Sequence, residues 1–173
     1  MKNDYLASLN TVVNSLLEDE AVRQIIDDVK AKIQKSEEPF IWRKIEIEPY
    51  RQYLPIYIKS CWVFALKRNR SSIAHYHPNS IQHTIMIEGK GKVNVGERTE
   101  ELNIFNPKDL AKTDAWVVVD SNIPHEFFPR DADMVVISFH TCEPERLVEI
   151  KCDSGGARSY EKSTYIHKNI INR

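Results

Sequence analysis

The chain has 173 residues, of which 42% are hydrophobic and 28% are charged, a composition typical of one globular domain with an appendage. Its 24 basic and 25 acidic residues leave a formal net charge of −1, so the overall charge gives no reason to expect nucleic acid or an anionic membrane as a partner. No run of residues approaches the roughly 20 apolar residues of a membrane-spanning helix, and the N-terminus lacks the apolar run of a signal peptide. We therefore expect a cytoplasmic protein.

The first part of the chain has the pattern of helices. Apolar residues recur at every third or fourth position from Leu6 to Leu16, and again from Val22 to Ile33. The two sets are out of phase across residues 17–20, which predicts two helices or one helix with a break near residues 18–20. Pro39 closes the region. We expect residues 1–38 to form a helical N-terminal arm, whose apolar stripe packs either on the rest of the chain or on a second subunit.

Residues 39–142 have the pattern of short strands between frequent turns. Turn residues occur at 68–71, 78–79, 89–91, 106–107 and 121–122, and such spacing favours an antiparallel sandwich or barrel. The candidate strands are residues 41–50, 57–68, 72–77, 83–89, 92–97, 116–120 and 134–140. Residues 143–173 resemble a C-terminal tail that packs on or extends from the barrel, with a helical turn in 144–150 and a loop in 152–159.

The chain has three cysteines, an odd number, and none of them is in a CxxC motif: Cys61, Cys142 and Cys152. This usage is typical of reduced, mostly buried thiols in a cytoplasmic protein.

The informative segment contains His75 and His77, which are separated by one residue. On a strand, residues i and i+2 point to the same face, so both imidazoles can converge on one point. A turn follows, and the next strand can return antiparallel and bring Gln82 alongside. Further along the chain, the valine-rich strand 116–120 leads through a tight turn to Pro124 and a third histidine, His125.

These segments resemble the two sequence motifs of the cupin superfamily. In the first motif, HxH is followed by three or four residues, Glu, six residues and Gly; here His75 and His77 match, Gln82 occupies the glutamate position, and Gly89 follows. In the second motif, PxG is followed by two residues and His; here Asp120 replaces the proline, Asn122 replaces the glycine, and His125 matches. Asn tolerates the left-handed backbone that such a turn requires.

The resemblance implies an all-β, double-stranded β-helix (jelly-roll) barrel with one divalent metal ion on His75, His77 and His125, in a chain that forms a homodimer. Gln82 departs from the first motif, because it offers a neutral carbonyl oxygen or an amide donor where the glutamate of the motif would offer an anionic oxygen. Gln82 then either ligates the metal or hydrogen-bonds a metal-bound water or the substrate, and the adjacent His83 is the alternative fourth ligand. Three neutral imidazoles favour an anionic exogenous ligand, and some cupins, including thiol dioxygenases, similarly use three histidines and no glutamate.

Other residues are weaker candidates for contact with a ligand. Tyr57, Trp62, Phe64, Met86, Phe127 and Phe139 are candidates for lining the barrel, and among them Phe127, Met86 and Tyr57, together with His83, are the candidate substrate contacts. We expect His140 at the rim or surface and His167 in solvent. Glu126 is adjacent to His125, so alternation along a strand directs its side chain away from the site.

The sequence predicts the function less closely than the fold, since cupins include both enzymes and simple binding proteins. We expect a metal-dependent enzyme, with dioxygenase-like or Lewis-acid chemistry on a small anionic substrate. Fe(II) is the expected metal, with Zn, Ni and Mn as alternatives. One alternative is a non-catalytic cupin that binds or senses a small molecule. The other is a metal-free sugar-binding or epimerase-like cupin with His75 or His77 as the base, for which the sequence lacks an obvious His–Asp pair near a lysine.

Overall fold

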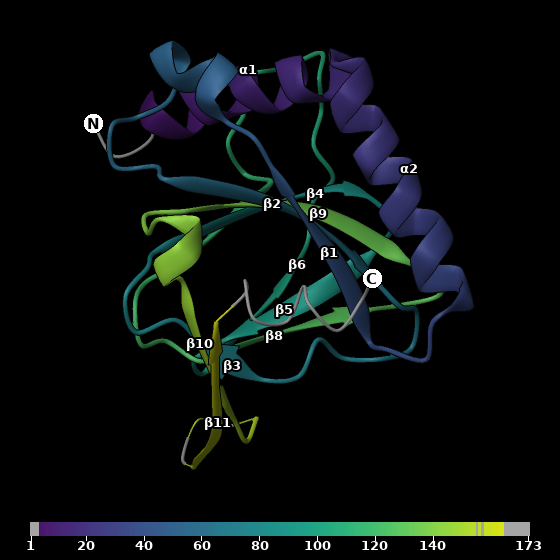
Figure 1. The fold of residues 1–173 in the computed structure, drawn as a ribbon. Coiled ribbons are helices and arrows are strands. Elements are labelled where there is room, and N and C mark those ends of the chain that lie inside the picture. The colour runs from purple at the N-terminus through teal and green to yellow at the C-terminus, as the bar shows by residue number, and fades with distance from the viewer. Residues whose placement is uncertain (1–3, 155, 157, 165–173) are drawn as a thin grey trace.

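The computed structural model describes residues 4–154, 156 and 158–164, which form two facing antiparallel sheets and an N-terminal pair of helices (Figure 1). In spatial order, the first sheet contains β1 (Phe40–Ile45), β2 (Ser60–Leu66), β9 (Met134–His140), β4 (Gln82–Glu88) and β7 (Trp116–Val119). The second sheet contains β11 (Ser159–Thr164), β10 (Val148–Cys152), β3 (His75–Tyr76), β8 (His125–Pro129), β5 (Gly91–Val95) and β6 (Arg98–Glu101). This arrangement is the double-stranded β-helix, and it confirms the predicted fold class.

The helical arm divides where the hydrophobic phase changes. Helix α1 spans Asp4–Glu18 and helix α2 spans Glu20–Lys35. Asp19 caps α2, because its Oδ1 accepts hydrogen bonds from the backbone N–H groups of Ala21 and Val22. This is the usual role of Asp at a helix N-terminus, and it explains why the break occurs between the two helices.

Both helices lie over the outer face of the first sheet (Figure 1). The chain's own sheet therefore covers the apolar stripe of the arm. The core between the helices and the sheet includes Leu9, Val13, Leu16, Val29, Ile33, Cys61, Val63, Ile137 and Phe139. Phe139 was expected to line the barrel, but it belongs to this outer core because it alternates with the inward-facing Ser138 and His140.

A second core fills the space between the two sheets. It includes Trp42, Trp62, Phe64, Met86, Val93, Phe127, Val136 and Leu147. The first sheet is thus buried on both faces, which explains why β2 and β9 are buried along their whole length. Such strands carry no inside–outside alternation in their hydrophobicity.

The structure differs from the sequence prediction in several segments. The strand expected at 41–50 ends at Ile45, because the proline at 49 begins a 3-10 helix, η1 (Glu48–Tyr53). The strand expected at 72–77 is reduced to His75–Tyr76. Within the segment expected as a tail, the described residues form the short helix η2 (Pro144–Arg146) and the strands β10 and β11, which belong to the second sheet. The expected helical turn in 144–150 corresponds to η2.

The backbone at Gly89, the glycine of the first motif, has a conformation that only glycine adopts without strain. Gly89 has φ of +96°, and a Cβ atom there would lie 2.6 Å from the carbonyl oxygen of Asp133. A residue with a side chain would therefore be both strained and in collision at this position.

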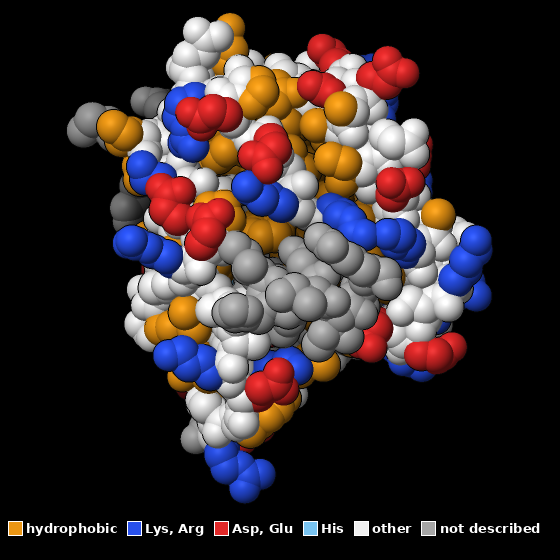
Figure 2. Space-filling model, viewed as in Figure 1, with side chains coloured by type: hydrophobic (Ala, Val, Ile, Leu, Met, Phe, Trp, Pro, Cys, Tyr) orange, Lys and Arg blue, Asp and Glu red, His pale blue; other side chains and the backbone are white. Residues whose placement is uncertain are grey.

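On the face that Figure 2 shows, Lys and Arg side chains lie among Asp and Glu side chains, in keeping with the near-zero net charge. The three cysteines are free, with Cys61 and Cys152 buried and Cys142 half-buried. None of the helices in the described residues is long and apolar enough to cross a membrane.

Candidate metal centre

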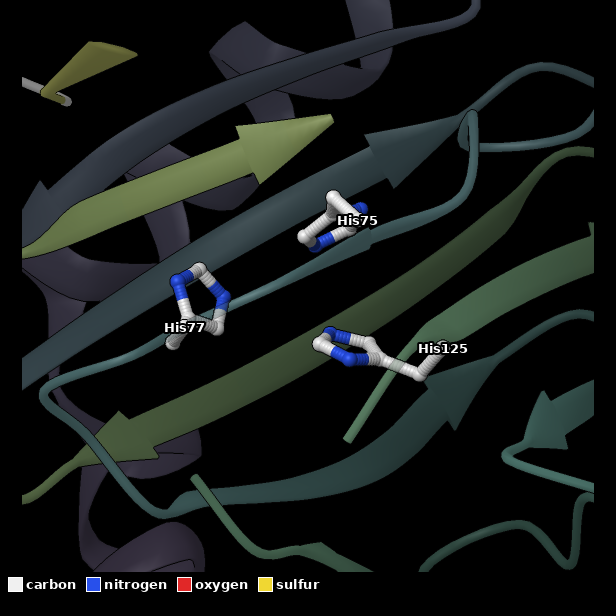
Figure 3. A group of neighbouring side chains, drawn as sticks. All are labelled: His75, His77 and His125. Carbon is white, nitrogen blue, oxygen red and sulfur yellow. The ribbon is translucent and has the colours of Figure 1, made fainter. Parts of the chain in front are cut away.

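Three histidines from two neighbouring strands and the turn between β3 and β4 converge inside the barrel (Figure 3). His75 on β3 is paired directly with His125 on β8, and His77 follows His75 by two residues. The ring centroid of His77 lies 5.3 Å from that of His75 and 5.5 Å from that of His125. One potential ligand atom from each of the three buried side chains lies within 4.8 Å of the others. This spacing suits a single metal ion.

Backbone carbonyl groups orient all three rings. The Nδ1 atoms of His75, His77 and His125 lie 2.8, 2.8 and 3.1 Å from the carbonyl oxygens of Ile73, Val148 and Ile123. A carbonyl oxygen can only accept a hydrogen bond, so we assign the proton of each neutral ring to Nδ1. Each Nε2 then carries a lone pair, which is the state in which histidine binds a metal.

The turns that position these carbonyl groups contain residues in the left-handed region. Asn122 has φ of +64°, as expected from its place in the second motif. Ile73 has φ of +68°, which is rare for a β-branched residue and costs about 1–2 kcal/mol. Because the carbonyl group of Ile73 accepts the hydrogen bond from His75, the strained backbone lies where it fixes a histidine of the site.

Burial keeps at least two of these histidines neutral. Burial, with a smaller contribution from the neighbouring His75, lowers the pKa of His77 to about 4, although Glu149 and hydrogen bonds partly oppose the shift. Burial also holds the pKa of His125 well below its ordinary value, with further contributions from His75 and His77. Neutral imidazole nitrogens suit Zn, Cu, Fe and Ni, so the site fits a divalent transition-metal ion.

Gln82 lies next to this site, on the inward face of β4. Its Nε2 donates to the Thr84 hydroxyl at 2.8 Å, and that hydroxyl lies 2.8 Å from the Ser138 hydroxyl. A side-chain hydrogen bond with Gln82 also contributes to the pKa of His77. The structure thus brings Gln82 to the three histidines.

His83 lies on the opposite face of β4, among residues that cover the outside of the sheet. Its ring centroid is 5.6 Å from that of Tyr5 on α1 and 6.5 Å from that of Tyr57. Burial is the main cause that lowers the pKa of His83 to about 4. The structure therefore does not bring His83 or Tyr57 to the three histidines, because alternation along β4 and the course of the η1–β2 loop place both outside the barrel.

Of the other candidate substrate contacts, Phe127 and Met86 point into the barrel. The ring centroid of Phe127 is 6.1 Å from that of His125. A cavity beside the site is lined by Phe40, Phe64, Leu66, Ser72, His75, Gln82, Phe127, Val136 and Ser138. The space within it for the centre of a water molecule is about 20 Å³, so in this conformation it accepts only a very small ligand. His167 lies outside the described residues.

Two further buried polar residues of the barrel escaped the sequence prediction. His140, expected at the rim, is fully buried, and its ring centroid lies 5.0 Å from that of His77. It is paired with Gln82 across β4 and β9, so both face inward. Glu149 on β10 is 2% exposed, and its charge acts on His77. Only the pairing of β9 with β4 shows that the side chain of His140 faces the inside of the barrel.

No protein-family model matches the sequence, and no curated protein matches it. Solved structures with a similar fold include a cupin 2 domain-containing protein from Halorhodospira halophila, with 12% identity, 79% of this chain and 77% of that chain covered, and a TM-score of 0.46. KdgF from Halomonas sp. has 12% identity over 60% of this chain and 79% of its own, with a TM-score of 0.46. A predicted oxalate decarboxylase from Thermotoga maritima has 10% identity over 58% of this chain and 78% of its own, with a TM-score of 0.43. At these identities and TM-scores the similarity carries no argument about this chain.

Proposed function

We propose that this protein, whose fold is that of the cupin superfamily, is a mononuclear metal-dependent enzyme that acts on a small anionic substrate. His75, His77 and His125 would hold the metal, with Fe(II) as the preferred ion. The observation that carries the proposal is the shared orientation of the three rings, in which each Nδ1–H is directed to a backbone carbonyl and each Nε2 is left as a ligand.

When bound, a divalent ion would polarise the substrate or, as iron, supply redox chemistry toward O2. Three neutral nitrogen ligands compensate none of its charge, and this supports an anionic substrate such as a thiolate, a carboxylate or an enolate. Gln82 adds no charge, and it can orient the substrate through its carboxamide group. Phe64 and Phe127 form part of the cavity wall, and exclusion of water by these apolar side chains would strengthen electrostatic interactions within the site.

His140 differs from the three proposed ligands in its hydrogen bonding. Its Nδ1 lies 3.2 Å from the Ser80 hydroxyl, and its buried Nε2 has no hydrogen-bond partner within the described residues. When the Ser80 hydroxyl donates to His140 Nδ1 in place of the carbonyl oxygen of Ile81, His140 carries its proton on Nε2. We propose that this N–H donates to the substrate and so helps to position it.

The alternative function is a non-catalytic module that binds or senses a small ligand at the same metal. The small volume of the cavity favours this alternative, because the barrel would have to open before a larger substrate could be bound and turned over.

An anaerobic reconstitution with Fe(II) tests the proposal. We expect small thiols, carboxylates or enolisable carbonyl compounds to change the visible or EPR spectrum of the reconstituted protein, and one class to be consumed, with O2 uptake if the chemistry is that of a dioxygenase. Spectral changes without turnover of any compound would favour the sensing module. Protein that takes up no metal would contradict both functions.

A further inference from the structure

We infer that the substrate of the proposed metal centre is a monoanion with a short apolar tail, whose charged end faces the three histidines and whose tail packs on an apolar wall. The residues of this wall are Phe40, Phe64, Leu66, Phe127 and Val136. The inference rests on the proposed function and narrows its substrate class, because it excludes zwitterions and dianions among the thiolates, carboxylates and enolates.

The cavity beside the histidines has no charged group of its own to receive a second charge. None of the described residues that line it is Lys, Arg, Asp or Glu. Its polar residues are Ser72, His75, Gln82 and Ser138, and all four already take part in hydrogen bonds within the barrel. A charge at the far end of a substrate would therefore be buried without a counter-ion, which is far more costly than the burial of a hydrocarbon group.

The strand register arranges the apolar residues in order along the first sheet. Ser138 lies on β9, with Val136 two residues before it, and Val136 is paired with Phe64 on β2. Two residues further along β2, Leu66 is paired with Phe40 on β1. All four apolar residues belong to the core between the sheets or pack against it. The wall thus becomes apolar with distance from the polar end, as the tail of an amphipathic anion requires.

Phe40 marks the place where the cavity approaches the surface. It is half-buried, whereas the other described residues that line the cavity are buried. Its ring centroid lies 5.6 Å from that of Trp42 and 6.3 Å from that of Phe64. Because the space for the centre of a water molecule is only about 20 Å³, the wild-type cavity suits a tail of a few carbon atoms. Removal of the Phe40 ring would lengthen this space toward the solvent.

Binding of carboxylates to the Co(II) protein, followed through the visible spectrum, tests the inference without requiring turnover. We expect the affinity to rise about two- to fourfold per methylene group from acetate to butyrate, the usual gain from burial of a CH2 group. Succinate and 4-aminobutyrate have the four-carbon chain of butyrate with a charge at the far end, and they should bind about tenfold more weakly or worse. On the Zn(II) protein, calorimetry should give a more negative heat-capacity change for butyrate than for acetate, the mark of apolar burial.

The variant Val136→Thr keeps the branched shape of the side chain and adds a hydroxyl group to the apolar wall. Its affinity for butyrate should fall about three- to tenfold, while its metal content and its affinity for acetate stay those of the wild type. The matched control is Val135→Thr, since Val135 is equally buried but lies in the core beneath the helices. Its preference for butyrate over acetate should not change.

The variant Phe40→Ala should extend the range of tails, with an affinity for hexanoate that rises about fivefold or more relative to the wild type and an unchanged affinity for acetate. Phe128→Ala is its control, because Phe128 is also half-buried but faces outward from the second sheet, with its ring 5.4 Å from Lys92 Nζ. This control should bind hexanoate like the wild type.

Equal affinities of the metal-loaded wild type for acetate, butyrate and succinate, or no binding of any of them, would overturn the apolar-tail inference and leave the histidine centre intact. An equal loss of butyrate affinity in both valine variants would overturn it as well. A wild-type protein that binds no metal would contradict the proposed function itself.

Discussion

His75 and His125 lie directly opposite each other on the antiparallel strands β3 and β8, with their ring centroids 4.3 Å apart. Only the strand register brings them together, since they are distant in sequence. Rings this close would repel each other if both were protonated, and burial and like-charge repulsion accordingly keep His125 neutral. Two imidazoles that each direct Nδ1 to a backbone carbonyl group are a favourable half of a metal site.

Substitution Gln82→Glu tests whether position 82 keeps the centre electropositive. The added carboxylate should compensate about one unit of charge and take a coordination position, so metal affinity should rise on the order of tenfold. Azide affinity, followed by visible or EPR spectroscopy on the Co(II) or Fe(II) protein, should fall. Equal azide affinity in the variant and the wild type would show that Gln82 has no influence on the charge of the site.

Substitution His140→Ala tests the proposed hydrogen bond to the substrate. The variant should keep one metal per chain, because His140 is outside the ligand group, and it should bind azide about five- to tenfold more weakly, the cost of one hydrogen bond of about 1–1.5 kcal/mol. His83→Ala is the matched control, since His83 is a buried histidine on the outer face of the same sheet, and its azide affinity should not change. Loss of metal from His140→Ala would instead make His140 a fourth ligand.

The stability of the metal-free protein should depend on pH through its buried histidines. The pKa of His83 falls from its ordinary value of 6.5 to about 4 on folding. Between these values the unfolded chain binds more protons than the folded one, so stability is fully present above about pH 6.5 and decreases as the pH falls toward 4. His77 contributes in the same direction.

His83→Phe isolates the contribution of His83, because it keeps an aromatic ring against Tyr5 and removes the titrating group. Urea unfolding at pH 7 and pH 5 should show a loss of stability that is smaller in the variant than in the wild type by about 1–2 kcal/mol. The same loss in both proteins would mean that His83 titrates normally in the folded state.

Asn10 should be essential for docking of the helical arm. From α1, its Oδ1 accepts from Trp116 Nε1 at 2.7 Å, and its Nδ2 donates to the carbonyl oxygens of Leu110 and Lys112 at 2.9 and 2.8 Å. Asn10→Ala leaves these buried groups without partners, so the free energy of unfolding should fall by about 2–4 kcal/mol.

The half-buried residue Asn14, whose side chain donates to Glu18 within the same helix, is the control for Asn10. Thermal unfolding of Asn14→Ala should resemble that of the wild type, and metal affinity should be unchanged in both variants. A stable Asn10→Ala protein would show that apolar packing alone holds α1 on the sheet.

The parts of the fold that follow a local period could be predicted from the sequence. The apolar residues from Leu6 to Ile33 predicted both helices and the break between them. The spacing of His75, His77 and Gly89, with Pro124 and His125, predicted the jelly-roll barrel through its resemblance to the cupin motifs.

The positions of the residues that the sequence prediction missed depend on contacts between segments that are distant in sequence. His140 ends a strand that is buried on both faces, so its hydrophobicity does not show which side chains face inward. Glu149 lies in a polar hairpin whose pairing with β3 has no local signature. Tyr57 resembles a barrel-lining residue, but it belongs to a loop whose course follows from the position of η1.

The most direct test of the account is the metal content of the untagged protein after anaerobic reconstitution, measured by elemental analysis alongside the three single variants His75→Ala, His77→Ala and His125→Ala. The account predicts about one equivalent of divalent metal per wild-type chain, a sharp decrease in each variant, and an unchanged far-UV circular dichroism spectrum in all four proteins. Full metal retention in any one variant would contradict the three-histidine centre.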